Sequence, residues 1–146
     1  MKFSRILVPT DFSESSQHAL QLAVRSVAED GATLTLLHVA PLPAPYPTDY
    51  GPIPVPVLLP NLAELEAESL KLLTAQAKGD IPEGMAWTPK SVLGVPADEI
   101  AREIEQGGYD LVVMGTHGRT GIRHLILGSV AERVLRSSKV PVLVTR

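Results

Sequence analysis

The sequence predicts an α/β fold: a single doubly wound sheet of five parallel strands with helices on both faces. Two observations predict it. Short apolar runs with strand character alternate with segments of helical periodicity along almost the whole chain, and such alternation is typical of parallel sheets joined by right-handed crossovers. The length of 146 residues fits one domain, which we expect to span residues 1–146.

The first part of the chain is expected to form a strand, a helix and a second strand. An apolar run predicts the first strand over residues 3–8, and apolar side chains at helical spacing predict a helix over residues 12–29. Asp11 and Glu14 have the spacing of a capping box at the start of this helix. Residues 32–39 are rich in apolar and β-branched side chains and predict the second strand.

Residues 41–60 break the alternation. Eight of the thirteen prolines of the chain lie in this segment, and regular elements do not accommodate them. A long segment of this kind inside a compact domain is typical of a lid, a binding loop or a surface insertion. The sequence leaves these alternatives open.

A second helix is expected to begin after Asn61, which has capping-box spacing with Glu64. Residues 85–93 predict a third, less regular strand, and Pro89 places that strand near an edge of the sheet or at a bulge. The predicted apolar face of the second helix carries Leu62, Leu65, Leu72, Leu73 and Gln76.

The remaining elements continue the alternation. Ser129 and Glu132 have the capping-box spacing, so Ser129 is expected to cap the last helix. The last strand is apolar on both faces, and an apolar strand at the edge of a sheet favours pairing with another chain. The elements expected here are a helix that opens at Pro96 and ends at 107–108, a strand over 109–114, a helix over 129–137 and a strand over 140–145.

Composition narrows the classes of protein that the chain can belong to. A formal net charge of −3 argues against a nucleic-acid binder, which usually presents a basic surface. The first fifteen residues do not resemble a signal peptide, and no stretch is long and apolar enough to span a membrane. Cysteine is absent, which excludes disulfides and thiolate ligands. We therefore expect a soluble, cytoplasmic protein without nucleic-acid or membrane partners.

Catalytic and metal-binding patterns are missing from the sequence. The four histidines are scattered without the HExxH spacing of a zinc site, so we expect no protein metal site. The chain has no GxSxG nucleophile elbow, and no base is obviously placed to activate a serine. We expect no catalytic residues, and at most slow hydrolysis of a bound nucleotide. His38 lies inside an apolar strand and is interpreted as a core histidine.

The segment GTHGRTGIRHLILGS at residues 115–129 carries the strongest functional signal. It follows a predicted buried strand, and glycines there let backbone N–H groups approach a phosphate. The pattern is neither the GxxxxGK[ST] of a P-loop nor the GxGxxG of a dinucleotide-binding fold. The glycines of this segment could instead serve turns alone. In a parallel sheet the segment shares the carboxyl edge with residues 9–11 and Val39.

With Gly115, Gly118, Gly128 and Ser129 in the spacing G-x2-G-x9-G-S, the chain resembles the ATP-binding members of the universal stress protein family. The stretches ILVPTDFSESSQHAL, LLHV, GVPADEI, DLVVMGTHGRTG and VPVLVTR extend this resemblance over the whole chain. It implies a Rossmann-like fold of the adenine nucleotide alpha hydrolase type.

The resemblance also implies a ligand and its site. The ligand is ATP, to which Mg²⁺ could be bound. Asp11 would hold the ribose hydroxyls, although its alternative is a helix cap, and Val39 would offer its backbone to adenine. Two copies of the chain would pair through residues 140–145 and form a homodimer. The implied binding residues are Pro9, Thr10, Asp11, Val39, Met114, Gly115, Thr116, His117, Gly118, Arg119, Gly128, Ser129 and Val130.

Several functions remain open on the sequence alone. We favour a dimeric, ATP-binding sensor or stress-response module. The alternatives are a slow ATPase or self-phosphorylating enzyme, a nucleotide-independent dimerisation or chaperone-like module, and a protein that binds AMP or a cyclic adenine nucleotide.

Overall fold

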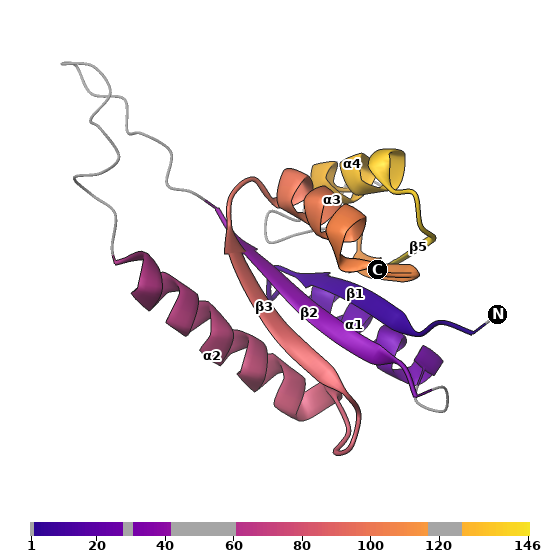
Figure 1. The fold of residues 1–146 in the computed structure, drawn as a ribbon, viewed down its shortest axis with the longest axis horizontal. Coiled ribbons are helices and arrows are strands. Elements are labelled where there is room, and N and C mark those ends of the chain that lie inside the picture. Colours follow the sequence, from indigo (N-terminus) through magenta and orange to yellow (C-terminus); the bar gives the residue numbers. More distant parts are fainter. Residues whose placement is uncertain (1, 28–30, 42–60, 117–126) are drawn as a thin grey trace.

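The fold was analysed in a computed structural model, which describes residues 2–27, 31–41, 61–116 and 127–146. Strands and helices alternate through these ranges, as the sequence predicts (Figure 1). The elements are β1 (Arg5–Thr10), α1 (Glu14–Val27), β2 (Thr33–Ala40), α2 (Leu62–Asp80), β3 (Trp87–Leu93), α3 (Pro96–Gly107), β4 (Leu111–Gly115), α4 (Ser129–Ser137) and β5 (Val142–Thr145).

Within the described ranges, five strands form one parallel sheet in the order β3-β2-β1-β4-β5. The predicted fold class is therefore confirmed. The chain first builds the sheet outward from β1 through β2 to β3, and then returns to the other side of β1 for β4 and β5. The order thus reverses between β1 and β4, where doubly wound sheets open a crevice at their carboxyl edge. β3, which contains Pro89, and β5 are the edge strands, as predicted.

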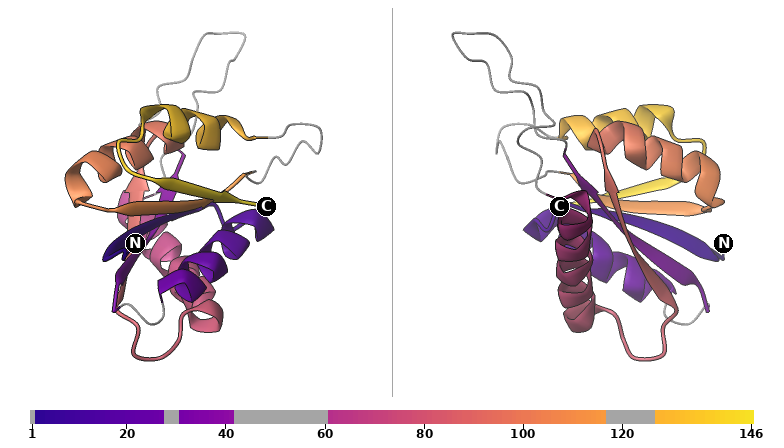
Figure 2. Two further views of the ribbon diagram at one scale, coloured as in Figure 1. Left: turned by 90° about the vertical axis from the view of Figure 1, so that its right-hand side faces the viewer. Right: turned by 60° about the vertical axis from the view of Figure 1, so that its left-hand side comes forward.

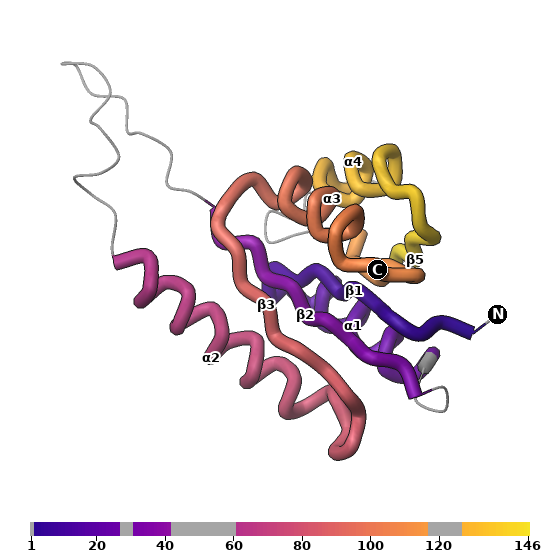
Figure 3. The backbone as a smooth tube through the Cα atoms, in the orientation of Figure 1, coloured from indigo at the N-terminus to yellow at the C-terminus, as the bar shows by residue number. Residues whose placement is uncertain are grey.

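The helices cover both faces of the sheet, as Figure 2 shows. On one face, α1 and α2 pack on side chains such as Ile6, Val8 and Leu36. On the other face, α3 and α4 pack on Leu7, Val39 and other side chains that alternate with the first set. Alternation along each strand therefore divides the core into two layers, one on each side of the sheet. Figure 3 follows the backbone through this arrangement, with α2 running beside β3 and α3 beside α4.

Two of the predicted helix caps are replaced by neighbouring residues. Ser13, not Asp11, stands before α1, and its Oγ accepts the Ser16 N–H at 3.3 Å. Gly128, not Ser129, is the N-cap of α4, and no side-chain capping bond forms there. Ser129 is the first residue inside α4, where its side chain lies too far along the helix to cap it.

The cap at α2 is as predicted, but the predicted apolar face of α2 is partly wrong. Asn61 Oδ1 accepts the Ala63 N–H at 3.1 Å. Leu73 is fully buried, whereas Leu62 and Leu72 are 46% and 47% exposed. The buried face instead includes small side chains, Ser69 and Ala77, because the helix lies close to the sheet where β2 and β3 run beneath it.

The prediction for the proline-rich segment 41–60 falls outside the described residues, apart from Pro41. Among the residues that are described, no helix is long and apolar enough to cross a membrane.

Candidate functional site

A cavity of about 410 Å³ lies at the carboxyl edge of the sheet. The ends of β1, β2 and β4 form one wall, and the first residues of α3 and α4 form the other. It therefore occupies the crevice that the reversal of strand order predicts. Its lining consists of Pro9, Thr10, Asp11, Ser16, Leu37, His38, Val39, Pro41, Pro96, Ile100, Met114, Gly115, Thr116, Gly128, Ser129, Val130 and Ala131.

The structure brings together every sequence-predicted site residue that it describes. These residues come from four separate places in the chain, 9–11, Val39, 114–116 and 128–130, and all of them line the cavity. The other three predicted residues, His117, Gly118 and Arg119, lie outside the described ranges. Whether this set binds a ligand stays a prediction.

Sequence reasoning missed part of the lining. Pro96 and Ile100 come from the first turn and a half of α3, and they reach the lining because α3 packs on the same face of the sheet as α4. His38 was interpreted as a core residue. It is partly buried, its Nδ1 lies 2.9 Å from the Thr10 carbonyl oxygen, and it also lines the cavity. The other residues missed are Ser16, Leu37, Pro41 and Ala131.

The N-terminus of α4 forms one wall of the cavity. The Gly128 N–H donates to the Thr116 carbonyl at 2.6 Å, and the Glu132 N–H donates to Gly128 O at 2.9 Å. The N–H groups between them, those of residues 129–131, precede the first acceptor that the helix can supply. Together with the helix dipole, equivalent to about half a positive charge at this end, they favour a negatively charged group.

The end of the β1–β2 ladder leaves a backbone edge in the cavity. The paired register of the two strands stops at Thr10 and His38, so Val39 is the next residue of β2 beyond it. The chain after β1 turns away, because the Phe12 N–H donates to Thr10 Oγ1 at 3.1 Å and Phe12 has a φ of 65°. Val39 itself lines the cavity at this edge.

Asp11 supplies a carboxylate at the same edge. Its Oδ1 accepts the Ser13 N–H at 3.0 Å, which fixes the turn between β1 and α1. A carboxylate has about four lone-pair sites and can accept several hydrogen bonds at once, hydroxyl donors included. The side chain is partly buried, which strengthens such bonds relative to water.

Apolar side chains form the remaining wall. Leu37, Val39, Ile100 and Met114 belong to the core layer under α3 and α4, and each also lines the cavity. Apolar surface beside a few convergent polar groups is typical of small-molecule sites. The arrangement suits a ligand with a flat apolar ring at one end, hydroxyl groups in the middle and an anionic group at the other end.

Gly115 has a packing role as well as a place in the lining. A Cβ at this position would lie 2.0 Å from Ser15 Oγ and 2.8 Å from the Ser15 carbonyl carbon. Close approach of α1 to β4 therefore demands glycine here, with or without a ligand.

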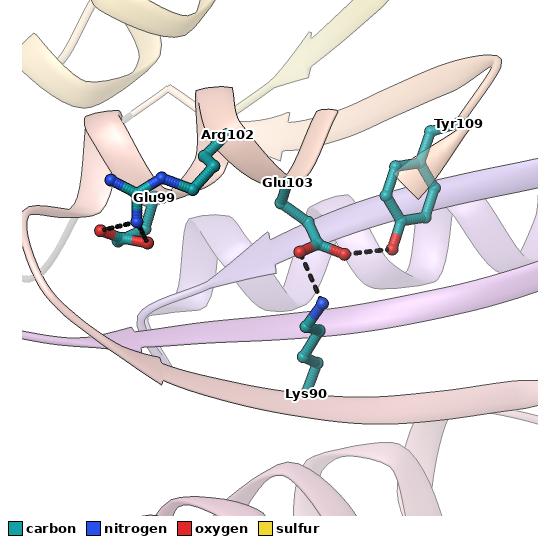
Figure 4. Close-up of polar contacts among 5 residues, drawn as sticks. All are labelled: Lys90, Glu99, Arg102, Glu103 and Tyr109. Atoms are coloured by element: carbon teal, nitrogen blue, oxygen red, sulfur yellow. Dashed lines mark hydrogen bonds and ion pairs between the residues drawn. The ribbon is translucent and has the colours of Figure 1, made fainter. Parts of the chain in front are cut away.

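A series of polar side-chain contacts outside the cavity holds α3 in place. The Glu103 carboxylate accepts Lys90 Nζ at 2.6 Å and Tyr109 OH at 2.7 Å, which ties α3 to β3 and to the start of β4 (Figure 4). Burial raises the pKa of Tyr109 from 10.0 to about 12; a hydrogen bond with Thr35 lowers that pKa, and the bond to Glu103 and its negative charge raise it. These contacts fix α3, and with it the positions of Pro96 and Ile100.

The fold and the cavity define a class: an α/β protein with a small-molecule pocket at the switch point of a doubly wound sheet. A model of the Universal stress protein family matches residues 2–146. The chain belongs to the universal stress protein family, and the predicted family membership is confirmed.

Three relatives agree with this membership over nearly the whole of their own chains. Universal stress protein MJ0577 of Methanocaldococcus jannaschii is 32% identical, over 99% of this chain and 95% of the relative. The structure of universal stress protein UspA from Lactobacillus plantarum has a TM-score of 0.82 at 26% identity and covers 100% of this chain and 99% of its own. A universal stress protein solved in complex with cAMP has a TM-score of 0.68 at 25% identity, over 100% of this chain and 98% of its own.

Proposed function

We propose that this protein binds an adenine nucleotide, with ATP as the first candidate, in the cavity at the carboxyl edge of the sheet. The observation that carries the proposal is the meeting of three features in one cavity: the α4 N-terminus, the Asp11 carboxylate and an apolar wall next to Val39. Each matches the chemistry of one part of a nucleotide, which supports the proposal.

In this proposal the base lies against the apolar wall. Leu37, Ile100 and Met114 contact its faces, and the backbone of Val39 offers hydrogen bonds to its polar edge. Backbone groups at a strand end are rigid, so they discriminate between donor and acceptor patterns of different bases. The ribose hydroxyls donate to Asp11, because a carboxylate accepts two such bonds well.

The phosphates lie at the start of α4. The N–H groups of residues 129–131 donate to phosphate oxygens, and the Ser129 hydroxyl adds a further donor. Gly115, Gly128 and Ser129 belong to the G-x2-G-x9-G-S spacing, whose second glycine is Gly118. By the same spacing, His117 and Arg119 are assigned to the phosphate side of the site. The walls of the site are assigned to Pro9, Thr10, Thr116 and Val130.

Binding rather than rapid turnover is the proposed activity. Among the described lining residues, the groups that could move a proton are Asp11 and His38, and His38 Nδ1 is within hydrogen-bonding distance of the Thr10 carbonyl. Both also have a structural or binding task in this proposal. Groups of three or more residues that could hold a metal ion do not occur in the described part of the chain, so any Mg²⁺ would be held mainly by the phosphates.

We further propose that the protein is a homodimer that pairs through residues 140–145 and acts as a stress-response module. β5 is the outer strand of the sheet, and the side chain of Leu143 is 39% exposed. An exposed apolar edge strand favours pairing with an identical strand.

A cyclic adenine nucleotide is the second candidate ligand, because a relative of matching fold was solved in complex with cAMP. The cavity features named above apply to both ligands, but a cyclic phosphate engages one ribose hydroxyl and leaves a single hydroxyl for Asp11. The test is to denature freshly purified protein and identify the released nucleotide by mass spectrometry. Release of ATP supports the first candidate and release of cAMP the second. Release of a guanine nucleotide, at the occupancy expected of an adenine nucleotide, would contradict both.

A further inference from the structure

A group of polar side chains joins the cavity wall to α2: Thr10 and Ser16 line the cavity, and Gln76 lies behind them. Its centre is the Thr10 hydroxyl, which lies 3.0 Å from Ser16 Oγ on α1 and donates to Gln76 Oε1 on α2 at 3.0 Å. Thr10 is 6% exposed and Ser16 is 4% exposed. Hydrogen bonds between such buried groups are well defined in geometry, because water does not compete for them.

The same hydroxyl holds the corner that carries Asp11. The Phe12 N–H donates to Thr10 Oγ1 at 3.1 Å, which keeps Phe12 at a φ of 65°. A bulky residue other than glycine pays a conformational cost in this left-handed region, so surrounding contacts must hold it there. One such contact is the His38 ring, whose centroid lies 4.5 Å from that of Phe12.

The direction of Asp11 depends on this turn. Asp11 lies between Thr10, whose hydroxyl is fixed by α1 and α2, and Phe12, whose N–H is fixed by that hydroxyl. Its own Oδ1 accepts the Ser13 N–H at 3.0 Å, and Ser13 O in turn accepts Ser16 Oγ at 2.8 Å. Each hydroxyl has one proton, and those of Thr10 and Ser16 go to Gln76 Oε1 and Ser13 O, so Gln76 is joined through Thr10 Oγ1 to the Phe12 N–H beside Asp11.

We propose that Gln76 is a positioning residue of the ribose subsite. It lies on α2, does not line the cavity, and acts through Thr10 by holding the corner at which Asp11 faces the ribose hydroxyls. This inference rests on the proposed function. It adds a residue from an element that contributes no side chain to the described lining.

The test separates positioning from general stability by changing the ligand as well as the protein. Gln76→Met keeps the length of the side chain and removes its hydrogen-bonding atoms. We expect it to weaken ATP binding about 5- to 10-fold, the loss of about one hydrogen bond. It should change the binding of 2′,3′-dideoxy-ATP, which has no ribose hydroxyls, by less than about 2-fold. Both dissociation constants are measured by isothermal titration calorimetry.

Gln21→Met is the matched control. Gln21 Nε2 donates to Asp80 Oδ1 at 2.8 Å, so it also joins α1 to α2 but has no contact with Thr10. Its ATP affinity should stay within about 2-fold of the unmodified protein. An equal loss in both glutamine variants would show that loosening of α2 alone accounts for the effect, and would overturn the inference.

The remaining outcomes are equally decisive. If Gln76→Met binds ATP as the unmodified protein does, or loses the same factor for ATP and 2′,3′-dideoxy-ATP, Gln76 does not position the ribose subsite. If the unmodified protein binds no nucleotide, the proposed function fails and this inference fails with it. Should Gln76→Met not fold, Gln76→Leu and Gln76→Glu replace it. The leucine variant should lose affinity for ATP selectively, and the glutamate variant, which keeps an acceptor for the Thr10 hydroxyl, should retain it.

Discussion

Gly115 shows how one residue serves both the core and the candidate site. The sequence suggested a phosphate-binding glycine, and the structure adds a packing reason, since any Cβ there would collide with Ser15 of α1. Two roles at one position follow from the geometry of the fold, in which the end of β4 lies between the cavity and the start of α1. Loss of affinity in a Gly115 variant would therefore need to be separated from loss of stability.

Gly115→Ala should lower the free energy of unfolding by about 1–3 kcal/mol, because the backbone of Ser15 must move to admit the new methyl group. Gly79→Ala is the control, since a Cβ at that position of α2 meets nothing within 4 Å. It should raise stability by up to about 1 kcal/mol through helix propensity. Urea unfolding followed by circular dichroism measures both, and equal stability of the two variants would contradict the packing account.

Ser129 gives a second prediction at the scale of the residue. Because Gly128 is the N-cap and no side-chain capping bond forms, Ser129→Ala should change stability by less than about 0.5 kcal/mol. Loss of a hydroxyl donor to phosphate should still weaken ATP binding about 5- to 10-fold. Thermal unfolding measures the change in stability, and calorimetric titration measures the change in ATP affinity. Unchanged affinity would remove Ser129 from the phosphate subsite.

At the scale of the element, α3 is held by Glu103, which accepts both Lys90 and Tyr109. Exposed ion pairs on the same helix, such as that between Arg102 and Glu99 at 2.6 Å (Figure 4), contribute little because water and salt screen them. Glu103 differs because it has a second partner, Tyr109, which is buried. Ionisation of that tyrosine should weaken the attachment of α3.

The pKa of Tyr109 sets the pH range of this effect. The pKa is about 12 in the folded protein, above its ordinary value of 10.0, so the unfolded chain loses the proton first. Stabilisation by Tyr109 is therefore fully present below pH 10 and is lost as the pH rises towards 12. The urea midpoint should fall across this range in the unmodified protein and fall less in Tyr109→Phe. Parallel curves for the two proteins would contradict the assignment.

Much of the element order could be predicted from the sequence, because periodicity and turn residues act locally. Asn61 was identified as a cap for this reason. The N-caps of α1 and α4 were each predicted at a residue close to the actual cap. Serine, aspartate and glycine all suit an N-cap position, so the sequence does not decide between such neighbours. The exposure of Leu72 and the left-handed Phe12 could not be predicted, because both depend on contacts with elements distant in sequence. Pro96 and Ile100 entered the site for the same reason.

At the scale of the whole molecule, the outer strand β5 predicts a homodimer that pairs through this strand. Light scattering at micromolar concentration should give twice the chain mass of 15.6 kDa. Leu143→Glu places a charge in the proposed interface and should give the monomer mass, while Leu72→Glu, an equally exposed leucine on α2, should leave the dimer intact. A monomer mass for the unmodified protein would rule out the proposed pairing.

The central claim, that the cavity binds an adenine nucleotide through Asp11, is tested most directly by calorimetric titration with ATP. Asp11→Asn keeps an acceptor for the Ser13 N–H but removes the charge. Glu105→Gln removes the charge of an exposed carboxylate, 3.6 Å from Lys139 and outside the described lining. We predict binding of one ATP per chain, about 10- to 100-fold weaker for Asp11→Asn and unchanged for Glu105→Gln. Absence of binding heat with ATP, AMP and cAMP, or equal affinity of all three proteins, would contradict the account.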